Sequence, residues 1–152
     1  MVKETIKSQS IIPRIDGIER DLEKLEDLGK LSLDILAIED NFIKAQFYLR
    51  RVLEGVFHIG SHILARMPGG RVTEYKEIAL KLGELCIVEK SFAANQLKKM
   101  AGYRNRLTHF YSDITPQEIH EIIQNHLEDI TVFLQAIREL LKHPEKYNLS
   151  LE

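Results

Sequence analysis

Apolar residues recur along the chain with the spacing of amphipathic α-helices. Between residues 11 and 29 they return every three or four positions with charged residues between them, and Gly29 can end the helix. A longer pattern of the same kind runs from Leu33 to Arg66 and stops at the breaker Met67-Pro68-Gly69-Gly70. These two stretches predict the first helix and the longest helix of the protein.

Capping residues and breakers predict three further helices. Thr73 can cap a short helix that ends near Gly83, and the next helix is expected from about Lys90 to Phe110. The run Thr115-Pro116-Gln117-Glu118 combines a capping box with a proline at the first helical position. It predicts the start of a last helix, which Pro144 ends.

The five predicted helices leave no room for a sheet, because strand-like alternation of useful length is absent. We therefore predict an all-α fold, an antiparallel bundle of four main helices plus a short one, forming a single domain over residues 1–152. Helices of this length in so small a chain leave apolar stripes that one copy does not cover. We expect a homodimer.

Composition agrees with a folded helical protein and excludes some functions. Apolar residues make up 44% and charged residues 29% of the chain, which is not the composition of a disordered protein. The net charge of −2 excludes a protein that coats nucleic acid nonspecifically, so any contact with RNA must come from a local basic patch. No apolar run approaches the roughly 18 residues that span a bilayer.

The single cysteine and the first residues bear on location. Cys86 has no partner for an intramolecular disulfide, and its neighbours Leu85 and Ile87 predict a buried thiol. The first ten residues lack the apolar stretch of a signal peptide. We expect a cytoplasmic protein.

One stretch of the fourth predicted helix, from about Lys90 to Phe110, carries groups that suit chemistry. With Arg104 as zero and about 100° per residue, the expected core face lies between about +20° and −100°; it comprises Leu97, Met100, Tyr103 and Leu107. Lys98, Asn105 and His109 fall at about 100° to 140°. The surface between Arg104 and His109 carries only small residues: Ala101, Thr108 and, just beyond them, Gly102. We interpret this surface as the solvent-facing floor of a polar cleft.

The residue types of this cleft suit the handling of a phosphate group. An imidazole can move protons near neutral pH, a guanidinium carries a permanent charge, and an amide can orient either group. The alternative from spacing alone is that Arg104, Asn105 and His109 are ordinary residues near a helix C-terminus, where cations are favoured. Few basic residues lie on this face: Lys98 lies on it, whereas Lys99 and Arg106 point elsewhere on the wheel.

The string Arg104-Asn105-x-x-x-His109-x-Tyr111 resembles the R-x4-H-x-Y motif of the HEPN superfamily. The version is that of HepT-like proteins, the ribonuclease toxins paired with minimal nucleotidyltransferases. Residues 50–64 resemble the long helix of that family, and residues 75–141 follow its order of short helix, turn, motif helix and capped helix.

The resemblance implies a function and a role for each residue of the motif. Arg104 and His109 are implied to cleave RNA without a metal or other cofactor, in a cleft at a dimer interface, with Asn105 as an orienting group. Lys98 and Arg104 are the expected RNA-binding residues. Tyr111 is implied to be the hydroxyl that a nucleotidyltransferase antitoxin modifies with AMP to silence the toxin.

Two other functions remain open at this point. The first is a HEPN module that binds RNA or nucleotides without cleaving them, with Tyr111 as a modification target. The second is a purely structural dimeric bundle. Glu54, His58 and His62 recur every four residues and could hold a metal, but no fourth ligand is evident, so packed or interfacial histidines are the simpler reading. Glu54 can instead orient a residue of the cleft.

Overall fold

The computed structural model of the chain describes residues 4–109 and 114–152. Its α-helices are α1 (Ser8–Gly29), α2 (Leu33–Leu36), α3 (Glu39–Leu64), α4 (Tyr75–Glu84), α5 (Lys90–Phe92), α6 (Lys98–Thr108), α7 (Pro116–Asn125) and α8 (Leu127–Lys142). A π-helical segment η1 (Ala93–Leu97) joins α5 to α6, and a 3-10 turn η2 (Pro144–Tyr147) follows α8. The all-α fold predicted from periodicity is confirmed.

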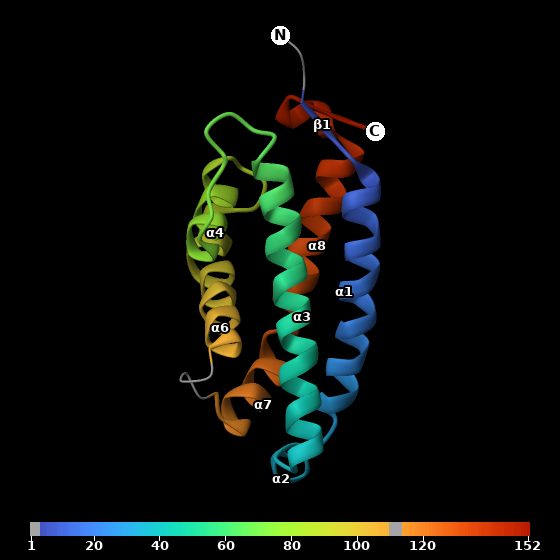
Figure 1. Cartoon of the computed structure of the whole chain (residues 1–152), viewed down its shortest axis with the longest axis vertical. Helices are drawn as coiled ribbons and strands as arrows, with labels where there is room; N and C mark the ends of the chain where they lie inside the picture. The colour runs from blue at the N-terminus through green and yellow to red at the C-terminus, as the bar shows by residue number, and fades with distance from the viewer. Residues whose placement is uncertain (1–3, 110–113) are drawn as a thin grey trace.

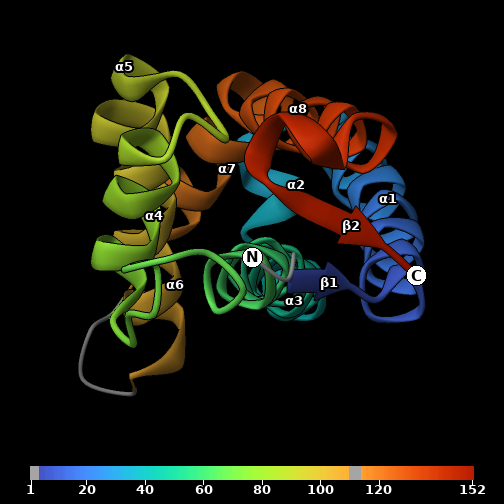
Figure 2. The same ribbon diagram turned by 90° about the horizontal axis from the view of Figure 1, so that it is seen from above.

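The long helices form an antiparallel bundle (Figure 1). Helices α1 and α6 run in one direction along the long axis, and α3 and α8 run in the other. Seen down that axis, α4, α5 and α6 gather on one side of α3, whereas α1 and α8 lie on its other side (Figure 2). Helix α6 packs against both α3 and α4. This double contact determines which residues of α6 are covered.

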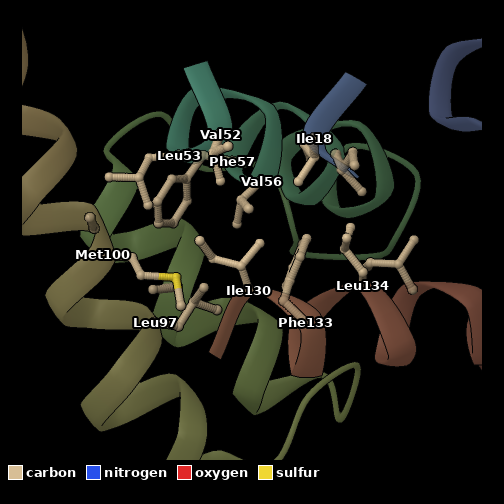
Figure 3. Packing of buried hydrophobic residues seen from close by; sticks show 14 of the residues in the cluster. Ile18, Val52, Leu53, Val56, Phe57, Leu97, Met100, Ile130, Phe133 and Leu134 are labelled. Atoms are coloured by element: carbon tan, nitrogen blue, oxygen red, sulfur yellow. The ribbon is translucent and has the colours of Figure 1, made fainter. Parts of the chain in front are cut away.

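The core follows the apolar periodicity of the helices. Side chains from α1, α3, α6 and α8 point toward one another in its centre, as Figure 3 shows for Ile18, Phe57, Met100 and Phe133. Phe57 and Phe133 are fully buried. Gly83 lets α4 approach η1 closely, because a Cβ atom at this position would lie 2.6 Å from that of Ala93.

Two helices that the pattern predicts as continuous are interrupted. The stretch from Leu33 to Arg66 breaks at Ile38, whose backbone is extended (ψ 134°); the carbonyl of Ile35 accepts both from the N–H of Ile38 at 3.2 Å and from the side-chain amide of Asn41 at 3.0 Å. The last helix breaks at His126 (φ −125°, ψ 3°). Neither break carries glycine or proline, so periodicity alone does not reveal it. The capping box of Thr115 and Glu118 is confirmed.

The fourth predicted helix is also less regular than expected. It contains the π-turn η1, and it ends at Thr108 instead of Phe110. His109 has an extended backbone (φ −101°, ψ 123°), so it lies beyond the helix. Its expected position on the helical wheel, in line with Asn105, is therefore wrong.

The two ends of the chain meet in a small parallel strand pair that the sequence did not indicate. Strand β1 (Glu4–Ile6) pairs with β2 (Leu149–Leu151), with Glu4 opposite Leu149 and Ile6 opposite Leu151. Ile6 and Leu149 are buried on the bundle. Three residues per strand are too few for alternation to stand out.

The prediction that the Cys86 thiol is buried is wrong. The Cys86 thiol is exposed and not buried, because its backbone adopts a left-handed turn (φ 61°) that points the side chain outward. Among the described residues, no helix is both long and apolar enough to cross a membrane.

Candidate functional site

Arg104, on α6, contacts side chains of two other helices, α3 and α4. From α6 its guanidinium reaches the ring of Tyr75 on α4, with Cζ 4.0 Å from the ring centroid. Its Nη2 lies 3.8 Å from Oε1 of Glu54 on α3. The Arg104 side chain is only 19% exposed, and its Nε is buried without a hydrogen-bond partner among the described residues. An ion pair of this length leaves guanidinium donors available for a further acceptor.

The covered face of α6 differs from the face expected on the wheel. At about 100° per residue, Met100, Leu97 and Ala101 lie near −40°, 20° and 60° from Arg104. All three are buried, and Ala101 is fully buried. The prediction that Ala101 faces solvent is therefore wrong. Because α6 contacts both α3 and α4, its covered arc is wide and Arg104 lies within it.

His109 follows the last residue of α6 and is exposed. The hydroxyl of Thr108 donates to the carbonyl oxygen of Arg104, one turn earlier in the helix, at 2.9 Å. This bond ties the last turn of α6 together between Arg104 and His109. A histidine on an extended residue after a fixed helix end can meet a substrate from solvent.

Asn105 faces a different side of α6 from Arg104. Together with Lys76, Lys98, Lys99 and Arg106 it lines an open groove of about 560 Å³, which we call the lysine groove. Gly102 forms part of its wall, and a Cβ atom there would meet nothing within 4 Å. The expectation that Lys99 and Arg106 point away from Lys98 and Asn105 is therefore wrong. The structure brings Lys98 and Asn105 together but separates both from Arg104.

The lysine groove is positively charged. None of its three lysines pairs with a carboxylate in the described ranges 4–109 and 114–152, and no acidic residue lines it. Arg106 is held by both oxygens of Glu118 in a two-pronged ion pair. The hydrogen bond from Arg106 lowers the pKa of Glu118, and Thr115 lowers it further. This links the groove to the cap of α7.

The stripe of Glu54, His58 and His62 serves packing and polar contacts in the structure. Glu54 faces Arg104, and a side-chain nitrogen of Arg14 lies 2.8 Å from Nδ1 of His58. Burial lowers the pKa of both histidines, and nearby Arg14 or Arg66 lowers them further, so both are neutral at pH 7. No group of three or more His, Cys, Asp or Glu side chains in the described part of the chain is arranged to hold a metal ion.

Two residues of the site were harder to find from sequence than the motif. Tyr75 and Lys76 lie at the start of α4, and no local spacing connects them with Arg104 or Lys98. Only the packing of α4 on α6 brings them together. Tyr111, the expected modification target, lies outside the described residues.

The bundle and its order of short helix, turn, motif helix and capped helix agree with the HEPN-like fold that the motif string suggests, although His109 follows the motif helix instead of lying on it. The chain belongs to the Ribonuclease HepT-like family, whose model matches residues 18–137. It is 28% identical over 137 residues to the tRNA nuclease HepT of Aphanizomenon flos-aquae, covering 89% of this chain and 92% of that protein. It is 25% identical to the mRNA nuclease HepT of Shewanella oneidensis, covering 84% and 96% respectively.

Solved structures share the fold. One is a toxin-antitoxin complex with AMP-PNP, with a TM-score of 0.78 and 21% identity over 86% of this chain and 98% of that one. Another is the tri-AMPylated HEPN toxin of Shewanella oneidensis in complex with an MNT antitoxin, with a TM-score of 0.77 and 24% identity over 85% and 96%. The predicted HEPN-like architecture is thereby confirmed.

Proposed function

We propose that the protein is a metal-independent endoribonuclease toxin neutralised by a nucleotidyltransferase antitoxin. Its family and the nuclease names of its relatives support an RNA-cleaving toxin. The observation that carries the proposal is that α6 holds the largely buried guanidinium of Arg104 near its end and is followed directly by the exposed His109. A guanidinium shielded from water stabilises a phosphate more strongly than one in solution.

In the proposed reaction the chain's own residues move protons and stabilise charge. His109 accepts the proton of a ribose 2′-OH, whose oxygen attacks the adjacent phosphorus. The bond from phosphorus to the 5′ oxygen breaks, and this oxygen takes the proton that His109 accepted from the 2′-OH. Arg104 stabilises the negative charge on the phosphoryl oxygens in the transition state. The products are a 2′,3′-cyclic phosphate and a free 5′-OH.

The lysine groove gives Asn105 and Lys98 a role in binding RNA. Both line a wall of α6 that carries positive charge and no carboxylate, which suits a phosphate backbone. We assign Asn105 to contact RNA in this groove and not to orient Arg104, because it faces away from that residue. The proposal includes a homodimer, which would double the basic surface. Light scattering of the purified protein should give the mass of two chains.

Cleavage should continue in an excess of chelator and should leave a cyclic phosphate, because the proposed chemistry uses the 2′-OH and two side chains. A single 2′-deoxy nucleotide at the cleaved position should stop cleavage at that bond. The same change several nucleotides away is the matched control and should have no effect. Mass spectrometry of the products provides the measurement. Cleavage of DNA, or strict dependence on Mg²⁺, would contradict the mechanism; binding without cleavage would favour the non-catalytic module.

Adenylylation of Tyr111 is the proposed route of neutralisation. The tyrosine oxygen attacks the α-phosphorus of ATP, pyrophosphate leaves, and the phenolic proton is released. The AMPylated toxin of Shewanella oneidensis supports such a modification in a protein of the same fold. A phosphodiester two residues after His109 in the sequence adds an anion that competes with RNA for cations.

Tyr111→Phe should therefore escape neutralisation. Co-expressed with the cognate antitoxin, this variant should still inhibit growth and should gain no AMP mass, because it lacks the accepting oxygen. Tyr147→Phe, in η2, is the control and should remain neutralised. A Tyr111→Phe toxin that the antitoxin silences fully would show that AMP transfer to this residue is not the mechanism.

A further inference from the structure

A second cavity lies between α6 and α8, with α3, η1 and α7 contributing to its lining. It has a volume of about 300 Å³, at the lower end of the range of small-molecule sites. We call it the α6–α8 pocket. Leu53, Met100 and Ile130 form part of its apolar wall, and Figure 3 shows their side chains pointing into the same region. Its polar lining includes Asn95, Gln96, Tyr103 and Asp129.

The π-turn places polar groups at this pocket. Asn95 and Gln96 belong to η1, and both are exposed and line the pocket. The Asn95 amide donates to the carbonyl of Ser91 at 2.8 Å, which leaves its oxygen as an acceptor. Short π-helical segments are uncommon and often occur at functional sites. The packing of α6 does not by itself require two amides at the mouth of a cavity.

The pocket and the lysine groove adjoin one another. Asn95, Lys99 and Tyr103 line both, so these three side chains form the boundary between an apolar cavity and a basic surface. Along the axis of α6, Tyr103 lies about 7.5 Å before Thr108, the residue that precedes His109, at roughly 1.5 Å per residue. A nucleic acid strand that follows the groove can thus enter the pocket with one base while a nearby phosphate reaches the motif.

We propose that the α6–α8 pocket binds one unpaired base of the RNA substrate and prefers bases that carry an exocyclic amino group. This inference rests on the proposed function and adds a specificity site to it. The apolar walls can cover the two faces of a base, as aromatic and aliphatic side chains do in proteins that bind single strands. The amides and the carboxylate can contact its edge.

Asp129 provides the preference. Its carboxylate is partly buried, lies 3.4 Å from Nδ1 of His126, and accepts hydrogen bonds without donating any. Adenine and cytosine offer an amino group to such an acceptor, whereas uracil offers carbonyl oxygens on either side of one N–H. Lys99 also lines the pocket and supplies a positive charge that can attract the RNA backbone. Burial raises the pKa of Tyr103, so its hydroxyl stays protonated and can donate.

The test measures binding of short oligonucleotides of A, of C and of U to the full chain, by fluorescence anisotropy at one fixed salt concentration. The chain carries His109→Ala so that the RNA is not cut. The A and C oligomers should bind about tenfold more tightly than the U oligomer. Asp129→Asn should bring this ratio close to one. Glu128→Gln, which removes the same charge from the adjacent exposed residue, should keep the preference.

A second variant fills the pocket. Gln96→Trp, at an exposed position, should weaken binding of all three oligomers about tenfold, whereas Thr131→Trp on the exposed face of α8 should not. If oligomers bind without preference and neither pocket variant changes binding, the pocket inference is wrong, and cleavage by the unmutated chain shows that the proposed function still stands. Loss of antitoxin neutralisation with unchanged RNA binding assigns the pocket to the protein partner and overturns the inference. A base preference that Asp129→Asn removes, together with no RNA cleavage by the unmutated chain, supports the pocket and refutes the nuclease.

Discussion

His109→Ala should lower the rate of RNA cleavage by about 10² to 10⁴-fold, because general acid–base catalysis by one positioned group contributes roughly that much. Growth inhibition on expression should disappear with it. The melting temperature should not change, because His109 is exposed and lies beyond the end of α6. Cleavage of a labelled RNA and thermal unfolding followed by circular dichroism provide the two measurements.

The control for this variant is His143→Ala. His143 follows α8 and lies 3.4 Å from a carboxylate oxygen of Glu145. The C-terminal end of α8 is at the end of the bundle opposite the last turn of α6 (Figure 1). His143→Ala should cleave RNA as the parent does. If His109→Ala is as active as His143→Ala, His109 is not catalytic. If His109→Ala unfolds, the histidine has a structural role that its exposed position does not explain.

Leucine should have opposite effects at two adjacent positions of α6. Ala101→Leu should lower the free energy of unfolding by about 1 to 3 kcal/mol, because Ala101 is fully buried and additional methylene groups overpack the core. Gly102→Leu should be neutral or stabilising by up to about 1 kcal/mol, because it replaces a helical glycine that faces open space. Urea unfolding of the two variants measures both values.

RNA binding by the same two variants should change in the reverse order: Gly102→Leu should weaken it and Ala101→Leu should leave it unchanged. Leucine at position 102 projects into the lysine groove and should weaken RNA binding in a chain that remains fully folded. The Ala101→Leu protein that remains folded should bind RNA normally. Equal stability of the two variants would contradict the burial of Ala101, and full RNA binding by Gly102→Leu would remove the lysine groove from the proposed binding path.

Local signals in the sequence predicted helices better than they predicted helix interruptions. Thr115 and Glu118 define the start of α7 because both partners of a capping box lie within one turn. The break at Ile38 depends on the amide of Asn41, which follows it by three residues and does not stand out among polar residues. The break at His126 lies between Glu121 and Asp129, whose side chains flank the imidazole at 3.3 and 3.4 Å. Such contacts become evident only once the chain has folded.

The site was predicted in composition but not in arrangement. The motif string identified Arg104, Asn105 and His109, but a helical wheel assumes one partner and one continuous helix. Helix α6 has two partners, α3 and α4, so its covered arc includes Ala101 and Arg104. The helix also ends before His109. Arg104 is held by Glu54 of α3 and Tyr75 of α4, which lie on other helices. Of these two residues, the sequence pattern suggested only Glu54 for this role.

The contacts of Arg104 affect how it can take part in a reaction. Stacking on Tyr75 and attraction to Glu54 fix the guanidinium before RNA arrives, so less side-chain entropy is lost on binding. A lysine at this position would keep the charge but lose the planar stacking surface and the fork of donors. The role proposed for Arg104 therefore depends on its shape as well as its charge.

The pairing of β1 with β2 has a practical consequence for handling the protein. Both strands lie at the end of the bundle opposite α7 and the last turn of α6 (Figure 1). A label or surface tether attached through either strand would therefore leave the motif end facing solution. Because the two strands are parallel neighbours, tethers at the two ends would hold the bundle in the same orientation, so single-molecule or surface-binding measurements made through one end can be checked through the other.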